Sequence, residues 1–462
     1  MDGQEAVRAL LAALGTNVVT LPREFGDRGV TDWSGLPSAP PLALIRPRDT
    51  AEVACALRIC HMHGQPVVTQ GGLTGLAGGA NLRGGEVALS LERMTKIVEI
   101  DAVSATMTVE AGTTLQTVQE AAAAAGFYFP LDLGARGSCT IGGNLATNAG
   151  GNRVIKYGMM RDQVLGLEAV RADGEVVGDM RKMIKNNSGY DLRNLLIGSE
   201  GTLAVITRAV LRLRPKPAAV ATAWCGLPSY AAVTTLLARA QAQLATGVSA
   251  FEVMWAGYHD IVLANLHALR QPLDDRHPFH VLLESVGTDP ARHGEAFEEF
   301  LGSMLEEGVV TDAALAASES HALAFWAIRD APGEYQKFIP NHAAYDVSFS
   351  IAQVGEVAER CHVRLRERWP DAAILLYGHL GDGNLHIAVD VPGLMAHAHD
   401  EIDDIIYAVT REYGGSISAE HGIGTKKKPF LAFTRSKADL HSMRAIKHAL
   451  DPIGILNPGK IF

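Results

Sequence analysis

An α+β fold with two domains is predicted by three features of the sequence. The chain has 462 residues, enough material for two or three domains with buried cores. Short strand-like apolar runs are interspersed with helical stretches along the chain. Near the middle, Pro215 and Pro217 end a strand-like run, and the composition then turns to alanine-rich helices. We therefore predict domains at residues 1–214 and 215–452, and we expect the tail 453–462, apolar at its end, to dock on the first.

The first domain is expected to combine short strands with three helices. An amphipathic surface helix over residues 5–15 comes first, and a second helix over 49–64 closes at Gly64. A third helix covers residues 113–126. Strands are expected at 42–47, 66–70, 87–91, 96–101 and 106–112.

The second domain is expected to hold a helix over 231–245, strands over 280–287 and 343–351, and a hairpin near the C-terminus. Two apolar runs, "AAILLYGHL" and "LHIAVD", bracket a four-residue turn, Gly381 to Asn384, which is a hairpin signal. This turn places His379 opposite His386 on one side of the ladder. Opposed residues have Cβ atoms about 5 Å apart, so both imidazoles would reach one ion.

Composition excludes several classes of protein. A formal net charge of -10 is the wrong sign for a nucleic-acid-binding face, although a small anionic substrate needs only a few local cations. The five cysteines are irregularly spaced without C-x-x-C, which indicates neither a disulfide framework nor a zinc ribbon. The N-terminus resembles neither a secretory signal nor a transit peptide, and no apolar run is long enough to span a membrane. We expect a reduced, cytoplasmic protein.

Two glycine-rich loops, "TQGGLTGLAGGA" (69–80) and "GSCTIGGNLATNAGG" (137–151), have the chemistry of a phosphate cradle. Glycine lets the backbone approach a pyrophosphate closely, and successive N–H groups form an anion nest. The first loop matches neither a Walker loop nor G-x-G-x-x-G, so on its own a glycine-rich surface turn is the better interpretation. The second loop also follows a strand-like run, and two such loops favour phosphate binding.

Near the C-terminus, "SISAEHGIGTKKK" adds a carboxylate and a third imidazole to the two hairpin histidines. His379, His386 and Glu420 together supply a ligand set suited to Zn²⁺ or another divalent ion with an open position. For each histidine, the ordinary alternative is a core residue whose ring is hydrogen-bonded within the protein and binds no metal. The lysines at 426–428 are interpreted as a solvated run, with only Lys426 near an anionic site.

Six motifs occur in order along the chain: "PVVTQGGLTGLAGGA", "LDLGARGSCTIGGNLATNAGGNRVIKYG", "KNNSGYDLRNLLIGSEGTLAVIT", "GHLGDGNLHI", "AEHGIGTKKK" and "LDPIGILNPGKIF". Together they resemble one enzyme family, the FAD-dependent 2-hydroxyacid dehydrogenases of the vanillyl-alcohol oxidase and p-cresol methylhydroxylase superfamily. The match is closest to D-lactate and D-2-hydroxyglutarate dehydrogenases and to the glycolate oxidase flavin subunit. The resemblance implies a p-cresol-methylhydroxylase-type FAD-binding domain and an α+β substrate (cap) domain.

The resemblance assigns FAD to both glycine loops and to two later segments. Leu73 stands where flavin-linking relatives carry histidine, so non-covalent FAD is expected. The residues implied to hold FAD are Gln70, Gly71, Gly72, Leu73, Thr74 and Gly75 in the first loop; Leu133, Gly134, Ser138, Gly142, Gly143, Thr147 and Asn148 in the second; then Gly201, Ile206 and Asn457.

The resemblance also implies the chemistry. The metal falls on His379, His386 and Glu420, with zinc expected first and manganese or iron as alternatives. His421 would be the general base, since imidazole accepts a proton near neutral pH. Arg329 matches the arginine that pairs with the substrate carboxylate; without the resemblance, a surface salt bridge to Asp330 or Glu334 would be preferred. Electrons would pass to a separate acceptor: an electron-transferring flavoprotein, a quinone or a cytochrome. A homodimer is left open.

The substrate tail is expected to be small or apolar, as in D-lactate. D-2-hydroxyglutarate dehydrogenases carry lysine, asparagine and threonine where this chain has Ala344, Ala388 and Gly333. A distal carboxylate buried without a cation would cost several kcal/mol. D-2-hydroxyglutarate remains the alternative if Lys337 or His342 replaces the missing cation. Two rivals from other classes are a non-redox, FAD-using alkyl transferase and an electron-transfer subunit without a substrate site.

Overall fold

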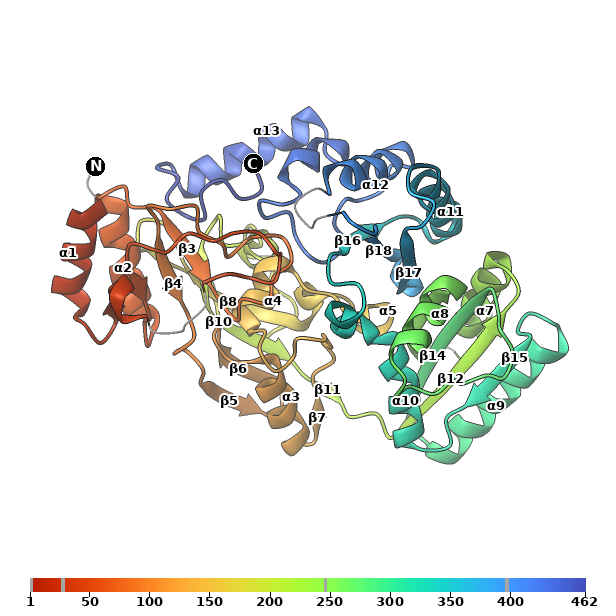
Figure 1. Ribbon diagram of the computed structural model, residues 1–462. Helices are drawn as coiled ribbons and strands as arrows, with labels where there is room; N and C mark the ends of the chain where they lie inside the picture. Colours follow the sequence, from red (N-terminus) through yellow and green to blue (C-terminus); the bar gives the residue numbers. More distant parts are fainter. Residues whose placement is uncertain (1–2, 26–29, 245–246, 395–398) are drawn as a thin grey trace. The chain divides into compact units, whose positions relative to one another are not determined.

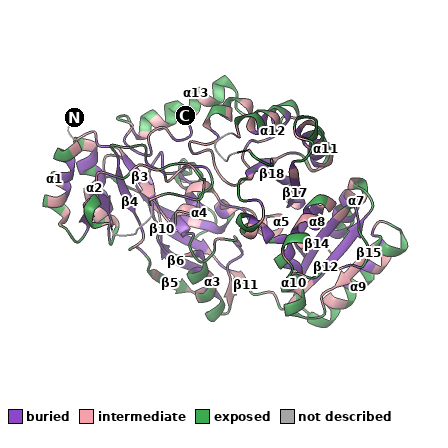
Figure 2. Ribbon diagram, viewed as in Figure 1, coloured by how far each residue is buried: buried purple, intermediate pink, exposed green. Residues whose placement is uncertain are grey.

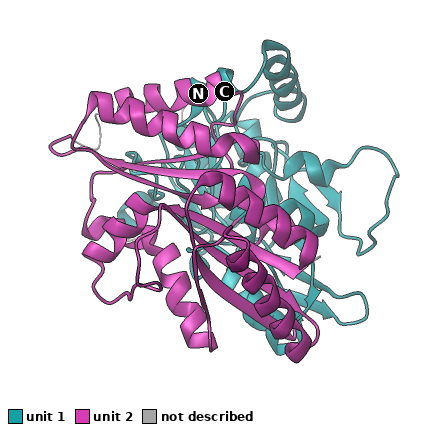
Figure 3. Ribbon diagram, turned by 90° about the vertical axis from the view of Figure 1, so that its right-hand side faces the viewer, with its two compact units in different colours: residues 1–150, 159–216, 420–462 teal, residues 151–158, 217–419 magenta. Residues whose placement is uncertain are grey.

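The computed structural model describes residues 3–25, 30–244, 247–394 and 399–462 and separates the chain into two compact units (Figure 3). Unit 1 consists of residues 1–150, 159–216 and 420–462, and unit 2 of residues 151–158 and 217–419. The sequence-based division differs at three places, the smallest being residues 215–216, which it assigns to the second domain. It assigns 151–158 to the first domain and 420–452 to the second.

Unit 1 contains two main sheets. In the first, β2 (Leu44–Ile45), β4 (Val87–Ser90) and β3 (Val67–Gln70) are parallel, and β1 (Val19–Thr20) pairs antiparallel with β2. The C-terminal tail extends this sheet, because Leu456 makes a parallel bridge to Val67. The second sheet is antiparallel in the order β5 (Ile97–Asp101), β6 (Thr106–Glu110), β10 (Val205–Arg212), β8 (Val164–Val170) and β9 (Val176–Asp179); a short pair joins β7 (Phe127–Tyr128) to β11 (Arg214–Pro215).

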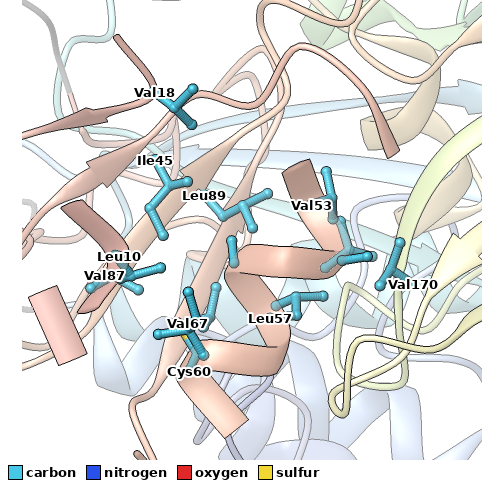
Figure 4. Close-up of a cluster of buried hydrophobic side chains, with 14 of the residues drawn as sticks. Leu10, Val18, Ile45, Val53, Leu57, Cys60, Val67, Val87, Leu89 and Val170 are labelled. Carbon is cyan, nitrogen blue, oxygen red and sulfur yellow. The ribbon is translucent and has the colours of Figure 1, made fainter. Parts of the chain in front are cut away.

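The helices of unit 1 pack on these sheets. Helix α2 (Thr50–Met62) starts at Asp49, whose side chain accepts the Glu52 N–H, and it buries Val53, Leu57 and Cys60 against the first sheet (Figure 4). Burying one such side chain contributes about 2 kcal/mol. The remaining described α-helices of this unit are α1 (Gly3–Leu14), α3 (Leu115–Ala124), α4 (Ile141–Thr147), α6 (Leu192–Leu196) and α13 (Lys437–Leu450) (Figure 1).

Unit 2 is built on one seven-stranded antiparallel sheet. The hairpin near the C-terminus pairs with the strand that begins at Val248, so segments far apart in the sequence lie side by side in this sheet. The order is β15 (Asp312–Leu315), β12 (Ala219–Leu227), β14 (Phe279–Gly287), β13 (Val248–Trp255), β17 (Ala373–His379), β18 (Asn384–Asp390) and β16 (Ala343–Ser348).

Helices cover both faces of this sheet, and most of its strand residues are buried (Figure 2). Helices α8 (Ala256–Asn265) and α10 (Glu319–Arg329) share one hydrophobic cluster with Trp224, Met254 and Leu282 on one face. On the opposite face, Tyr230 of α7 (Tyr230–Gln243) packs on Trp255 and Phe279. The helices α9 (Pro290–Glu306), α11 (Ile351–Arg368) and α12 (Asp400–Glu412) complete the cover.

The segment 151–158 joins unit 2 through a buried ion pair. It contains α5 (Val154–Tyr157), which contacts β13 and the turn after β17. Arg153 pairs with Glu284 of β14, and Trp326 Nε1 donates to the same carboxylate at 3.1 Å. The insertion is therefore held by charge as well as by packing.

The predicted α+β architecture is confirmed. Strands form within each of the predicted strand ranges, and helices α1, α2 and α3 occupy the three helical ranges predicted for the first domain. Across the described parts of the chain, the structure contains no helix with the length and apolarity needed to cross a bilayer.

Two histidines stack in the core of unit 2. The rings of His259 on α8 and His280 on β14 lie 3.9 Å apart between centroids, and Trp224 Nε1 donates to His280 Nδ1 at 3.1 Å. Burial first, and then the nearby His259, His277 and Arg276, lowers the pKa of His280 to about 3. Burial lowers the pKa of His259 to about 4. Both rings are therefore neutral in the folded protein at neutral pH.

Unit 2 should lose stability as the pH falls through 6.5. His259 and His280 then bind protons in the unfolded chain, whereas in the folded protein their lowered pKa values keep them unprotonated. The free energy of unfolding is unaffected by these histidines above pH 6.5 and falls with pH until their folded pKa values are reached. Between pH 7 and pH 5, His259 alone lowers it by about 2 kcal/mol. His259→Phe should flatten this dependence in urea unfolding, whereas substitution of the exposed His267 should not. Equal slopes for His259→Phe and the wild type would contradict this account.

Candidate functional site

The two hairpin histidines lie on one face of the unit 2 sheet as diagonal neighbours. The register pairs Tyr377 with His386, so the expected direct opposition of His379 and His386 is wrong. The turn comprises residues 380–383 instead of 381–384, because Leu380 to Asp382 form a 3₁₀ turn and Gly383 takes a left-handed φ of 78°. Side chains two residues apart on a strand share a face, so both histidines still point the same way. Their ring centroids are 5.2 Å apart, and ligand atoms of the two imidazoles lie within 4.8 Å.

A buried carboxylate, Glu252 on β13, joins His379 to Arg329. Its two oxygens accept hydrogen bonds from His379 Nδ1 at 2.8 Å and from Arg329 Nε at 2.6 Å. Burial alone would raise the pKa of Glu252, but the charges of His379 and Arg329 and their hydrogen bonds outweigh it and hold the pKa below its ordinary value. An ionised acceptor requires that Nδ1 carry the proton, so in the neutral ring Nε2 has the lone pair, and Arg329 Nη2 lies 3.2 Å from that nitrogen.

Arg329 is a core residue, so the surface salt bridge considered from sequence is wrong. It is 5% exposed at the end of α10, and its guanidinium lies 5.1 Å from the centre of the Tyr377 ring. Tyr258 fixes the backbone there, since its hydroxyl donates to the carbonyls of Ile328 and Arg329 at 2.9 Å. Asp330 is a distant second partner at 3.9 Å. Sequence reasoning found Arg329 but missed Glu252, which lies 77 residues earlier in the chain.

A second buried carboxylate, Asp346, flanks His386 on the other side. Asp346 lies opposite His386 in the β16–β18 register, and ligand atoms of the two residues lie within 4.8 Å. Asn384 Nδ2 donates to Asp346 Oδ1 at 3.0 Å, and the Ala419 N–H donates to the Asp346 carbonyl at 3.3 Å. Ala419 is the last residue of unit 2. Glu420 follows it directly, with about 3.8 Å between their Cα atoms.

Glu420 and His421 begin the C-terminal segment of unit 1. Both are partly buried. Beyond them the lysine run is not a solvated stretch: Lys427 is 2% exposed, and Lys428 Nζ donates to the Gly459 carbonyl at 3.3 Å. The lysines therefore belong to the packing between this segment and the C-terminal tail.

The first glycine loop of unit 1 presents a run of free backbone donors. Among the described residues, the N–H groups from Gly71 to Gly75 donate to no protein acceptor. Leu73 adopts a left-handed φ of 57°, which turns neighbouring N–H groups toward one side. Gln70 is fully buried at the base of the loop, where its Nε2 donates to the Ala80 carbonyl at 3.1 Å.

The second glycine loop packs directly on the first. A Cβ on Gly72 would lie 1.9 Å from the Ser138 carbonyl oxygen, and one on Gly71 would lie 2.5 Å from Thr140 Oγ1. Gly142 is packed against Ala111, and Gly143 donates to the capping Thr140 hydroxyl at 3.3 Å. Among the other residues predicted with this loop, Leu133 is partly buried, whereas Gly134 and Ser138 are exposed. The Thr147 hydroxyl donates to the Gly143 carbonyl within α4, and Asn148 ends that helix with a φ of 51°.

The three remaining predicted FAD residues are buried in unit 1. Ile206 is a buried core residue of β10. Asn457 accepts the Thr69 N–H at 2.9 Å, and its Nδ2 donates to the Glu200 carbonyl at 2.6 Å. Gly201, with φ 68°, fits against the Asn457 side chain, where a Cβ would come within 3.0 Å of Nδ2. Asn457 and Gly201 thus lie against Thr69, at the start of the first glycine loop.

The residues of unit 1 fit a phosphate-bearing cofactor such as FAD. Free N–H groups in the first loop supply donors for a pyrophosphate, and the glycines of both loops leave the backbone open to close approach. The residues of unit 2 fit a divalent ion, because two imidazoles converge on one face and one of them is oriented by a carboxylate.

Comparison with known proteins gives consistent matches along the chain. The model of the C-terminal domain of FAD-linked oxidases matches residues 216–461, and an FAD-binding domain model matches 41–178. A D-2-hydroxyglutarate dehydrogenase of Xanthomonas citri pv. viticola is 38% identical over 99% of this chain and 96% of its own length. A mitochondrial D-2-hydroxyglutarate dehydrogenase of Bos taurus is 39% identical over 99% and 83%. A Schizosaccharomyces pombe protein named as a mitochondrial D-lactate dehydrogenase is 33% identical over 93% and 83%.

Solved structures share the fold. A p-cresol methylhydroxylase superposes with a TM-score of 0.79 at 16% identity, covering 99% of this chain and 96% of that one. An alkyldihydroxyacetonephosphate synthase superposes with a TM-score of 0.77 at 18% identity, covering 99% and 85%. Unit 1 thus has a p-cresol-methylhydroxylase-type architecture, accompanied by a second domain.

Glu252→Gln should destabilise unit 2 by about 3–5 kcal/mol, because the Arg329 charge would stay buried without its counter-charge. Glu334→Gln is a matched control in the same unit, since Glu334 pairs with Lys337 at the exposed surface and such pairs contribute about 0–1 kcal/mol. Urea unfolding at pH 7 compares the two. Equal stability of both variants would show that the buried charges do not depend on each other.

Proposed function

Because the chain belongs to the family of FAD-linked oxidases, we propose that it oxidises a D-2-hydroxy acid to the corresponding 2-oxo acid with FAD as the electron acceptor. The observation that carries the proposal is the sheet face of unit 2, where Glu252 holds Arg329 beside the histidine hairpin. A buried cation next to two converging imidazoles suits a substrate with a carboxylate and an adjacent hydroxyl. Relatives named for D-2-hydroxyglutarate and D-lactate support this substrate class.

Each set of residues has one task in the proposed reaction. Bound FAD supplies a two-electron acceptor for the α-hydrogen. The N–H groups from Gly71 to Gly75 bind the pyrophosphate, and Leu73 offers no atom for a covalent flavin link, so the cofactor is held non-covalently. Arg329 pairs with the substrate carboxylate. His421 would accept the hydroxyl proton on an imidazole nitrogen, because an imidazole group ordinarily exchanges protons near neutral pH.

His379, His386 and Glu420 would hold a divalent ion, with zinc preferred and manganese or iron as alternatives. Such an ion would supply Lewis acidity at the substrate hydroxyl. Glu252 supports this ligand set because its hydrogen bond fixes the ring orientation of His379. The Ala419 N–H, which donates to the Asp346 carbonyl, fixes the backbone of the residue that precedes Glu420. Two histidines and one carboxylate leave an open position for substrate oxygens.

A small or apolar substrate tail is favoured by the residues beside His386. Ala388 follows His386 on the same face and lies opposite Ala344. Ala388 also shares a buried hydrophobic cluster with Tyr335, Ile339, Leu375 and Tyr377. Two basic side chains flank this cluster: Arg329 lies over the Tyr377 ring, and His342 lies against the Tyr335 ring. We therefore propose a D-lactate-like substrate.

D-2-hydroxyglutarate is the second candidate, because the relatives from Xanthomonas citri and Bos taurus carry its name. Lys337, one of the two cations considered as a substitute partner for a distal carboxylate, is exposed and paired with Glu334. In either case the electrons would pass to a separate acceptor, for which an electron-transferring flavoprotein, a quinone and a cytochrome remain the alternatives.

Anaerobic addition of D-lactate, D-2-hydroxybutyrate and D-2-hydroxyglutarate should bleach the flavin absorbance, and kcat/KM should be highest for the first two. An alkyl transferase or a subunit limited to electron transfer would show no bleaching with any of them. A clear preference for the dicarboxylate would refute the argument from Ala344 and Ala388.

His386→Ala should remove most of the bound metal and activity and leave the flavin spectrum nearly unchanged, since His386 lies in unit 2 and the candidate FAD loops lie in unit 1. Metal content by mass spectrometry and flavin absorbance check the two halves of this expectation. His267→Ala, at an exposed position of the same unit, is the control. Full activity of chelator-treated protein without detectable metal would rule out a metal role.

A further inference from the structure

Glu200 of unit 1 holds the loop that follows His421. Its carboxylate accepts the N–H of Ile423 and the N–H of Gly424, each at 2.7 Å and each on a separate oxygen. The residue is only 8% exposed, and it has a left-handed φ of 51°, which a non-glycine residue adopts at a cost. Hydrogen bonds from N–H groups to a buried carboxylate are short and strong. The loop is thus fixed two and three residues beyond the proposed proton acceptor.

The other side of this loop is packed on the first glycine loop. The N–H groups of Thr425 and Lys426 donate to the Ala77 carbonyl at 2.9 and 3.1 Å. A Cβ on Gly424 would lie 2.0 Å from the same oxygen, so only glycine allows this approach. Residues 423–426 are therefore clamped between Glu200 and the first glycine loop.

The backbone of Glu200 contacts the other parts of the candidate FAD site. Its N–H donates to the Ala146 carbonyl in α4 at 2.8 Å, and its carbonyl accepts from Asn457 at 2.6 Å. Asn457 in turn accepts the Thr69 N–H at the start of the first glycine loop. One residue thus joins both glycine loops, the tail and the loop after His421.

We propose that Glu200 is a positioning residue that sets His421 and Glu420 in register with the two FAD loops. This inference rests on the proposed function, in which His421 accepts the substrate proton. The side chain must have two acceptor oxygens and this length. Glutamine would turn an NH₂ group toward one of the two N–H donors. Burial raises the pKa of Glu200 above its ordinary value, and the two N–H groups and the charges of Lys427 and Lys460 oppose that rise.

A purely structural role would make Glu200 no different from Glu86. Glu86 is also buried in unit 1, and its carboxylate accepts two consecutive N–H groups, from Arg83 at 2.9 Å and Gly84 at 2.7 Å. No predicted catalytic, metal or FAD residue lies in the Arg83–Glu86 turn. Glu86→Gln therefore makes the same chemical change without touching the proposed machinery.

The test compares Glu200→Gln with Glu86→Gln by anaerobic stopped-flow reduction of the flavin, steady-state kcat and KM, FAD content, and hydrogen exchange of peptides covering 420–428. We expect Glu200→Gln to lower the flavin-reduction rate constant and kcat at least tenfold, with KM within about threefold and FAD content unchanged. Exchange at Ile423 and Gly424 should accelerate. Glu86→Gln should keep the rate constant within about twofold while losing similar thermal stability.

A wild-type rate in Glu200→Gln, or equal rate losses in both variants, would overturn the proposal, as would unchanged exchange of the loop. Should Glu200→Gln fail to fold, Gly422→Ala gives the same test, because its Cβ would lie 2.9 Å from the Glu200 carboxyl carbon and displace the loop. Faster exchange with a wild-type reduction rate in that variant overturns the proposal. If no D-2-hydroxy acid reduces the wild-type flavin, the proposed function fails, and the exchange data still report on the Glu200 anchor.

Discussion

The buried carboxylate of Glu252 determines how the candidate site of unit 2 is built. It accepts from Arg329 and from His379, two side chains that the chain brings from a helix end and a strand end. Each of these groups would be costly to bury alone, and leaving one unpaired costs about 3–5 kcal/mol. The contact also fixes the tautomer of His379 and the direction of the guanidinium. In the proposed site, one acid that touches neither ligand would therefore set both metal binding and carboxylate recognition.

Local features of the candidate site could be predicted from the sequence, because they depend on short-range chemistry. The glycine loops, the hairpin and the adjacent Glu420 and His421 are recognisable from residue types and spacing. The hairpin register was not predictable, because Leu380 looks like a strand residue and instead starts a 3₁₀ turn.

Features that depend on tertiary neighbours could not be predicted. Glu252 lies 127 residues from His379, and nothing near it in sequence marks it as a partner. Lys427 looks like part of a solvated run, yet it is buried and its charge acts on the carboxylate of Glu200, more than two hundred residues earlier. Glu200 lies next to the predicted Gly201, but its role depends on a loop more than two hundred residues later.

The path of the chain between the two units has a consequence for how this protein can be divided or recombined. Residues 151–158 leave unit 1 in mid-sequence, pack on unit 2 and return, and the Arg153–Glu284 pair secures them. A gene fragment encoding only residues 217–419 would leave Glu284 without its cation. A fragment of unit 1 would need three separate pieces of coding sequence. The two units are thus not exchangeable modules, and fusions that swap one of them between relatives must carry the short α5 insertion together with the unit 2 sheet.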